Sequence, residues 1–225
     1  MKRPLTTRLR TAALVLLPVL LVACNPGGNR TGSVNDIDGN TYRTVTIGDK
    51  TWMSENLRVS HYRNGDPIPE VRDQQAWGTL KSGAWSTYDL SEDNGKKYGN
   101  LYNWHAVNDP RGLAPQGWHV ASEKEWSALV EATGGEQQAG ASLKAAGKWS
   151  GASNSQPAGF DALPAGARRD TDGSFLMIGQ FARFWTSTAA GEAKAIARAM
   201  GFYDDAVRSG EVKMENGFSV RCVKD

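Results

Sequence analysis

The stretch Gly117–Trp126 places the strongest constraint on how this chain folds. Ser122 is followed three residues later by Glu125, the spacing of a capping box, in which each side chain satisfies a free backbone N–H of the first helical turn. Apolar residues then recur at helical spacing as far as Val130, and the pair Gly134-Gly135 predicts where the helix ends. The stretch therefore predicts a helix that is packed on an aromatic core, with no catalytic chemistry of its own.

Strand patterns come before this helix. The alternating run Tyr42–Ile47, the turn Gly48-Asp49 and the return Lys50–Met53 predict an antiparallel hairpin. Asn35–Asn40 has aspartates at alternate positions, but it lacks the remaining ligands and the closing Glu of a calcium loop, so we interpret it as a hairpin turn. Residues 60–100 are expected to be rich in loops, with turns marked by Asn64–Pro67 and Asp93–Gly95.

Two kinds of pattern follow the capped helix. Ala139–Ala146 predicts a second short helix. Within 193–202, alanines alternate with larger residues, among them Arg198. This pattern predicts a strand with one small inner face and the larger residues outside, although the same alanines could form a helix. Further alternating runs lead to a last strand within Gly217–Val223. Many glycines among aromatic residues favour a mixed α and β fold over a helical bundle.

The N-terminus has the pattern of a bacterial lipoprotein signal. Residues 1–23 contain a basic segment and then an apolar segment too short to cross a bilayer. Leu21-Val22-Ala23-Cys24 resembles a lipobox, in which Cys24 is acylated after cleavage, and several acyl chains anchor a protein stably. Residues 24–34 are predicted to form a flexible tether. Asn25, in place of Asp, favours the outer membrane by the enterobacterial sorting rule.

The charge balance argues against nucleic acid as a partner. Four basic residues lie in the first 23 positions, so the chain that follows has 22 basic and 24 acidic residues. Such a chain lacks the basic footprint of proteins that bind nucleic acid. The expected partners are instead the membrane, through the lipid, and an unknown protein or glycan.

Seven landmarks in order resemble the Fibrobacter succinogenes major paralogous domain, which is found in bacterial surface lipoproteins. They are Asp36–Gly48, Trp52–Leu57, Tyr98–Trp104, Gly117–Val120, Phe160–Gly166, Phe184–Thr188 and Gly217–Asp225. The resemblance covers residues 35–225, which we take as the domain.

That family is similar to the C-type-lectin-like fold, which also houses formylglycine-generating enzymes and the variable proteins of diversity-generating retroelements. The resemblance implies an α+β domain with small antiparallel sheets, two flanking helices, long loops and paired terminal strands. It also makes this chain a candidate target of such a retroelement. Members often have a Cys where this chain has Ala114; if that Cys is the usual partner of the C-terminal one, Cys222 has lost it. We expect Cys222 to be a buried, unpaired thiol.

The sequence contains no pattern that predicts a catalytic residue, a metal site or a cofactor. An oxidase of the formylglycine-generating type needs two nearby cysteines, and only Cys222 remains after lipidation. The three histidines have no paired spacing for zinc. Calcium-dependent sugar binding needs Glu-Pro-Asn or Gln-Pro-Asp, whereas this chain has Gln156-Pro157-Ala158, and Trp185-Thr186-Ser187 lacks the carboxylate of the lectin strand. No nucleophile elbow or phosphate loop is present.

The sequence therefore predicts a surface-anchored, non-enzymatic binding module whose ligand face lies within Thr186–Asn216. The residues expected to contact the ligand are Phe202, Tyr203, Asp204, Asp205 and Arg208, because an aromatic pair beside charges suits an adaptable contact surface. An ordinary solvated hairpin tip is an equally good interpretation of these residues. One alternative function is an envelope structural or assembly lipoprotein that docks another membrane protein. A hydrolase with an unrecognised site is another.

Overall fold

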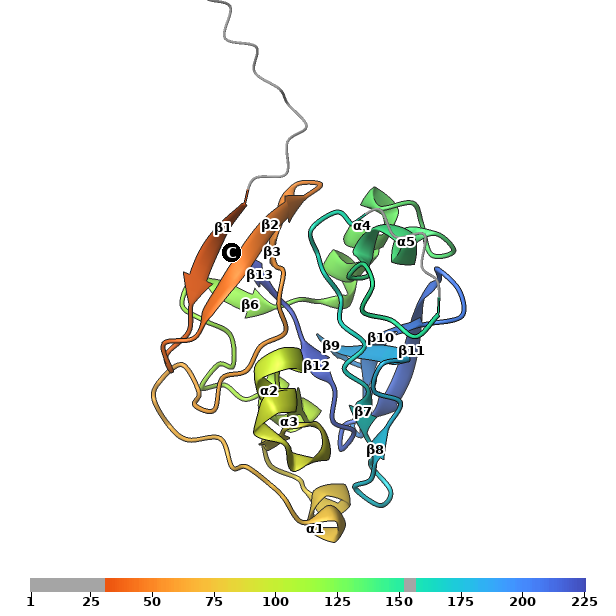
Figure 1. Cartoon of the computed structure of the whole chain (residues 1–225). Coiled ribbons are helices and arrows are strands. Elements are labelled where there is room, and N and C mark those ends of the chain that lie inside the picture. The colour runs from red at the N-terminus through yellow and green to blue at the C-terminus, as the bar shows by residue number, and fades with distance from the viewer. Residues whose placement is uncertain (1–30, 152–156) are drawn as a thin grey trace, which may run out of the picture.

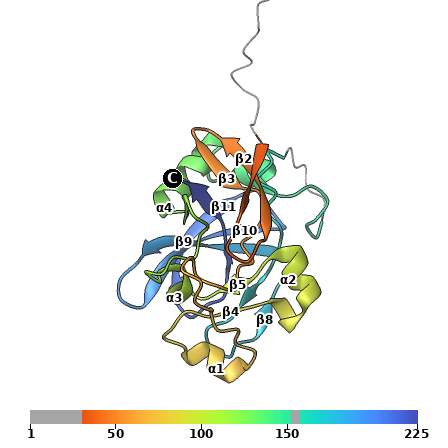
Figure 2. The ribbon, with the colours of Figure 1, turned by 90° about the vertical axis from the view of Figure 1, so that its left-hand side faces the viewer.

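Two sheets organise the chain in the computed structural model, which describes residues 31–151 and 157–225 (Figures 1 and 2). The larger has the order β1-β2-β3-β13-β6, the second has the order β11-β10-β9-β12, and two small ribbons pair β4 with β5 and β7 with β8. The strands are β1 Thr31–Asn35, β2 Thr41–Ile47, β3 Lys50–Met53, β4 Trp85–Ser86, β5 Leu101–Tyr102, β6 Trp118–Val120, β7 Ala167–Arg168, β8 Phe175–Leu176, β9 Phe181–Ala189, β10 Lys194–Gly201, β11 Val207–Lys213, β12 Ser219–Val220 and β13 Cys222–Lys224. The helices are α1 Gln74–Thr79, the 3-10 turn Tyr88–Leu90, α2 Glu92–Tyr98, α3 Trp104–Val107, α4 Glu123–Ala132 and α5 Ala139–Leu143.

The ends of the described chain meet in the larger sheet. Strand β13 pairs with β3, where Val223 lies opposite Trp52, and with β6 on its other side. The C-terminus therefore lies beside the N-terminal strands (Figure 1). These features confirm the predicted α+β, C-type-lectin-like architecture, with two details added. The final strand joins the N-terminal strands through β3 and not through β1, and β12 pairs with β9 in parallel.

Regular structure begins earlier than the predicted boundary at residue 35. Thr31–Val34 falls within the predicted tether, yet Thr31–Asn35 forms strand β1, with Val34 opposite Tyr42 of β2. The segment is polar and almost wholly exposed. It forms a strand because ladder hydrogen bonds between backbones do not require apolar side chains. Residues 1–30, which include the signal segment, Cys24 and most of the tether, lie outside the described residues.

The central strands are covered on both faces, because the hydrophobic core has two parts. Trp185 packs in one part and its neighbour Phe184 in the other. In β10, Ala197 belongs to the first part and Met200 to the second. Successive side chains of a strand point to opposite faces, so a strand between two cores buries both of its faces. Strand β10 is thus confirmed as a strand, but the prediction of a single small inner face was wrong.

Helix α4 forms as the capping box predicts. The Ser122 hydroxyl accepts the Glu125 N–H at 3.3 Å, and the Glu125 carboxylate accepts the Ser122 N–H at 2.9 Å. After the helix, Gly134 and Gly135 both adopt positive φ, and the N–H of Gly135 reaches back to Val130 O at 2.9 Å. The buried face includes Trp126, which packs in the second part of the core.

Helix α2 corrects the loop prediction for residues 93–95. Ser91 caps the helix by accepting the N–H of Asn94, acidic residues occupy its first turn, and Lys96 and Lys97 lie in its last turn. This order of charges favours the helix dipole. Gly95 was taken as a turn signal, but it lies inside the helix, where a Cβ would come within 2.5 Å of Thr87 Cγ2. Close packing, and not a turn, accounts for this glycine.

Buried arginines hold the long loops together. Arg168 is fully buried between the rings of Trp77 and Phe175, and its guanidinium donates to Gly173 O at 3.0 Å and to Asp73 O at 3.2 Å. Burial lowers the pKa of Arg168 to about 10, so it stays charged at neutral pH. One guanidinium has five N–H donors in a fixed plane. It can therefore satisfy several loop carbonyls that have no partner in a sheet or helix.

The second cysteine is buried in the first part of the core. Cys222 is a free thiol, and Ala114, which occupies the position where the family often has Cys, packs in the same cluster. Burial raises the pKa of the Cys222 thiol far above its usual range.

No helix among the described residues has the length and apolarity needed to cross a membrane.

Candidate functional site

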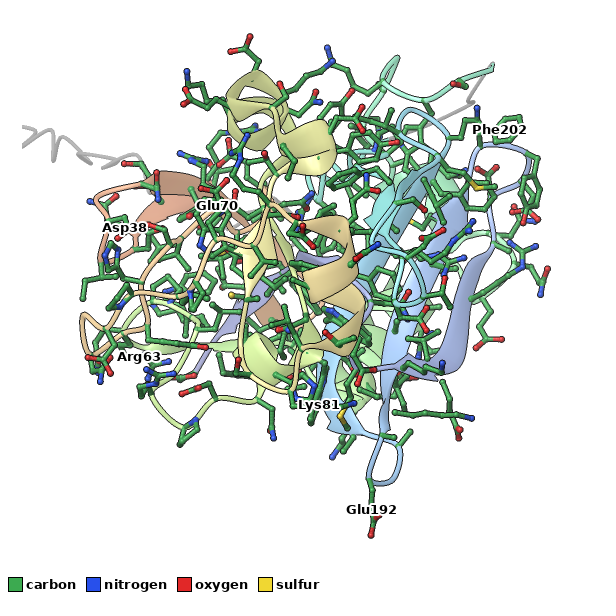
Figure 3. All side chains as sticks on the ribbon, turned by 90° about the horizontal axis from the view of Figure 1, so that it is seen from below. Asp38, Arg63, Glu70, Lys81, Glu192 and Phe202 are labelled. Atoms are coloured by element: carbon green, nitrogen blue, oxygen red, sulfur yellow. The ribbon has the colours of Figure 1, made fainter. Side chains whose placement is uncertain are left out.

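The hairpin between β10 and β11 brings all five predicted ligand residues together. Met200 lies opposite Val207, and Ala199 lies opposite Arg208, so residues 202–206 form the connection. Figure 3 shows Phe202 at the outer edge of the molecule, away from Asp38. We call residues 202–208 the hairpin tip.

An aromatic platform supports the exposed part of the hairpin tip. Phe181, the first residue of β9, contacts the rings of Phe202 and Tyr203, with centroids 6.3 and 5.7 Å away. Those two rings are 5.6 Å from each other, and the side chains are 41% and 58% exposed. Gly201 leaves the necessary room, because a Cβ there would lie 2.7 Å from Tyr203 Cε1. The two rings are therefore fixed in place and still open to a partner.

The charged half of the tip is an ion pair beside Tyr203. Both terminal nitrogens of Arg208 donate hydrogen bonds to the Asp204 carboxylate, and the Nη1–Oδ1 distance is 3.0 Å. The Arg208 guanidinium also lies 5.4 Å from the centre of the Tyr203 ring. Its hydrogen bonds lower the pKa of Asp204. This pairing orients polar groups next to an aromatic face.

The base of the tip is anchored on helix α5. Lys144 is 2% exposed, and its ammonium donates to Asp204 O and to Asp205 Oδ1, the latter at 3.3 Å. Gly140 N donates to Asp205 O at 2.8 Å. The Asp205 carboxylate thus faces a buried lysine, which suits a supporting role better than ligand contact.

Sequence reasoning located the tip but missed its support. Both supporting residues are far from the tip in the sequence. Lys144 lies 60 positions before Asp204, which it holds, and Phe181 belongs to a different strand from Phe202. Neither lies in a pattern that points to this role. The only local hint is Gly201, a glycine directly before an aromatic pair.

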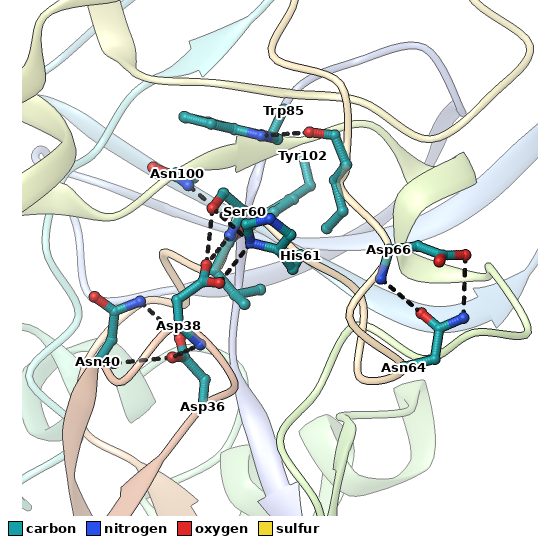
Figure 4. A network of polar contacts seen from close by, with 12 residues as sticks. Asp36, Asp38, Asn40, Ser60, His61, Asn64, Asp66, Trp85, Asn100 and Tyr102 are labelled. Atoms are coloured by element: carbon teal, nitrogen blue, oxygen red, sulfur yellow. Dashed lines mark hydrogen bonds and ion pairs between the residues drawn. The ribbon is translucent and has the colours of Figure 1, made fainter.

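The hydrolase alternative draws attention to Ser60, His61 and Asp38 (Figure 4). The His61 ring contacts Asp38 Oδ1 at 2.6 Å and Ser60 Oγ at 3.2 Å, both through Nδ1. The serine hydroxyl also donates to Asp38 Oδ2 at 2.8 Å. A catalytic relay needs the serine on one ring nitrogen and the acid on the other. These three residues therefore close a surface turn and do not form a relay.

His105 is the other histidine relevant to that alternative. Burial lowers its pKa, and it lines a hollow of about 460 Å³ together with Lys81 and Arg111. Its Nε2 has no hydrogen-bond partner among the described residues, so no nucleophile is held against this base there. Nor do residues 31–151 and 157–225 bring together three His, Cys, Asp or Glu side chains that could hold a metal ion.

The lectin-type calcium motif can be checked in part. Gln156 lies outside the described residues. Thr186 is buried and donates to Ile196 O at 2.8 Å, and buried Trp185 donates to Tyr102 O at 2.8 Å. Trp185 and Thr186 therefore pack within the scaffold, whereas Ser187 is exposed.

His119 links the C-terminus to α4. Nδ1 lies 2.6 Å from Asp225 Oδ1, and Nε2 lies 2.9 Å from Glu125 Oε1. Burial disfavours the charged ring, but the two carboxylates outweigh burial and raise the pKa of His119 above 6.5. The protonated ring stabilises the fold below the unfolded-state pKa, and this stabilisation is lost as pH rises through the folded-state pKa.

We therefore expect the stability difference between wild type and His119→Gln to be larger near pH 6 than near pH 9, by about 0.5–1 kcal/mol because the site is partly exposed. Urea unfolding at both pH values measures it. A difference that does not change with pH, or that grows as pH rises, would contradict the ion pair.

The fold and the site first define a class, namely an α+β domain of C-type-lectin-like architecture that presents an anchored hairpin tip. The model of the Fibrobacter succinogenes major domain matches residues 45–224. The chain belongs to this family. No curated protein and no solved structure matches the chain.

Proposed function

We propose that this chain is an envelope lipoprotein, anchored in the outer membrane through acylated Cys24, whose domain is a non-catalytic binding module. Its ligand face is the hairpin tip. The tip lies within Thr186–Asn216, the segment that varies in the related retroelement-diversified proteins. The expected ligand is a protein or a glycan, and no cofactor takes part.

The observation that carries this proposal is the exposed aromatic pair. Four large hydrophobic side chains are exposed within the described residues, namely Ile37, Met177, Phe202 and Tyr203. Only Phe202 and Tyr203 form a ring pair. Aromatic residues beside arginine dominate binding energy at protein interfaces and in adaptable binding loops. An assembly protein that docks on a neighbour would instead favour a broad apolar patch.

Within the tip, the residues take different roles. Phe202 and Tyr203 provide the contact area, at low entropic cost because Phe181 already fixes their rings. Arg208 and Asp204 provide oriented polar groups next to them. Asp205 holds the loop on Lys144 and acts as a positioning residue.

A binding screen tests the ligand face. The full chain, purified in detergent, is screened against glycans and envelope proteins, and Tyr203→Ala and Arg208→Ala are compared on each binder. Each substitution should weaken binding at least about tenfold, as expected for an interface hot spot. Ile37→Ala removes an exposed apolar side chain elsewhere and should leave binding unchanged. Wild-type affinity in both tip variants would reject this site.

The lipid anchor is tested separately. Growth with labelled palmitate should label the wild type and Cys222→Ala, but not Cys24→Ala, because only Cys24 follows the lipobox. Mass spectrometry should find an acylated Cys24 as the first residue of the mature chain. An unlabelled wild type, or a mature chain that begins elsewhere, contradicts the anchor.

A further inference from the structure

A second hollow lies away from the aromatic platform, between β3 and the end of α2. It has a volume of about 360 Å³ and is lined by the residues after β3, the last residues of α2 and the loop after α5. That volume is within the range of sites for small molecules. Lys144 contacts the hairpin tip, whereas Ala145 and Lys148 line this hollow, so the two sites use different residues.

The floor of the hollow is fixed. Asn56 is buried, and its side chain accepts from Arg221 Nε at 2.7 Å and donates to Tyr98 O at 2.8 Å. Gly99 has φ of +79°, and a Cβ there would lie 2.7 Å from Asn56 Cβ and 2.8 Å from Leu57 O. A ligand would therefore meet a surface that is already shaped, which lowers the entropic cost of binding.

The lining is strongly basic. It includes five cationic side chains, Arg43, Arg58, Lys96, Lys97 and Lys148, and two carboxylates, Glu55 and Asp161. Both carboxylates pair with Arg43, at 3.4 and 3.2 Å. Arg58 bonds instead to Asn40 Oδ1 and Thr41 O, and Lys97 lies over the Tyr98 ring. The described residues therefore provide no carboxylate for Arg58, Lys97 or Lys148, in a chain that is slightly acidic after residue 23.

A further cation lies beneath the floor. Arg221 is fully buried, and burial lowers its pKa only to about 9, so it is charged at neutral pH. Its Nη2 donates to Asp161 O at 3.1 Å, and its Nε contacts Asn56. A charge in a poorly solvated interior is weakly screened. Arg221 therefore adds to the positive potential within the hollow.

We propose that this hollow binds a small organic anion of monosaccharide size, whose carboxylate or phosphate group meets Arg58, Lys97 and Lys148. Tyr98, Ala145 and Leu163 give the hollow an apolar side for the carbon skeleton, a mixture of apolar walls and few polar groups that is typical of ligand sites. A carboxylate and a phosphate would make the same charge-assisted contacts here, and the choice of probes distinguishes the two.

Calorimetric titration of the full chain in detergent tests the site, with glucuronate, glucose 6-phosphate, neutral glucose and inorganic phosphate as probes. At least one anionic sugar should bind at least about tenfold more tightly than glucose, and added salt should weaken the binding of that sugar. Inorganic phosphate should bind more weakly than that sugar, because it cannot use the apolar side. Equal binding of glucose, or of inorganic phosphate, would overturn the proposal.

Variants locate the binding. The double variant Lys97→Gln/Lys148→Gln should weaken binding of the anionic sugar at least about tenfold, because it removes two charge-assisted contacts. Both lysines are exposed, so folding should be unaffected. Lys124→Gln, which changes an exposed lysine on α4, and Tyr203→Ala should leave binding intact. Loss in Tyr203→Ala, or retention in the double variant, would overturn the assignment, and neither result depends on the hairpin tip having a ligand.

Discussion

Replacing Arg221 with methionine should lower the free energy of unfolding by about 3–5 kcal/mol, the cost of breaking a buried polar network. The guanidinium donates to Asn56 Oδ1, Met53 O, Phe160 O and Asp161 O, at 2.7, 2.9, 2.6 and 3.1 Å. These acceptors lie on two separate segments of the chain, residues 53–56 and 160–161, and Arg221 joins both to a third. Methionine fills part of the volume but leaves the acceptors without a donor, and an unsatisfied buried acceptor is costly.

Denaturant unfolding monitored by tryptophan fluorescence measures this loss. Arg221→Lys should lie between wild type and Arg221→Met, because one ammonium cannot reach acceptors spread around a planar fork. Arg169→Met removes an exposed arginine paired with Asp172, and it should change stability by less than about 0.5 kcal/mol. A loss below about 1 kcal/mol in Arg221→Met would show that the network does not hold the loops.

Trp126→Ala should destabilise the fold by about 3–5 kcal/mol, the range for removing a large aromatic side chain from a packed core. Its fully buried ring lies 5.5 Å from Trp52, 5.4 Å from Phe160 and 5.2 Å from Phe184. Alanine would leave a cavity at the junction of α4, β3 and β9. The surrounding rings belong to different elements, so they cannot close it without moving the elements.

Trp126→Phe should cost much less than Trp126→Ala. Phenylalanine keeps most of the ring contacts, and Trp126 Nε1 has no hydrogen-bond partner among the described residues, so little polar bonding is lost. Trp104→Phe serves as the comparison, because it loses the bond from Nε1 to Thr186 O at 2.9 Å. Unfolding curves of the three variants rank them. Equal losses in Trp126→Phe and Trp126→Ala would contradict a role based on ring packing.

Local patterns predicted the local parts of this fold. The α4 cap is set by Ser122 and Glu125, and the β2–β3 hairpin by alternation around Gly48-Asp49. Both depend on neighbours within a few positions, which a sequence displays directly. The fold class itself came from the order of family landmarks.

Contacts between distant segments could not be predicted in this way. Arg198 was expected on the outer face of its strand, but it is buried and pairs with Glu123, 75 positions away on α4. Gly95 was taken as a turn signal, but it is glycine because the side chain of Thr87 packs against it. The local sequence around Gly95 does not show that contact. The candidate site follows the same division. The aromatic and charged residues of the tip are contiguous and visible, whereas Phe181, Lys144 and the basic hollow are assembled only by folding.

Amide hydrogen exchange of the full chain, with and without the ligand from the screen, tests the central claim most directly. We expect slower exchange on binding at the backbone amides of residues 202–208, and no change in the β2–β3 hairpin of the scaffold. Protection elsewhere, with unchanged exchange at the hairpin tip, would contradict the claim that this scaffold presents the tip to its ligand.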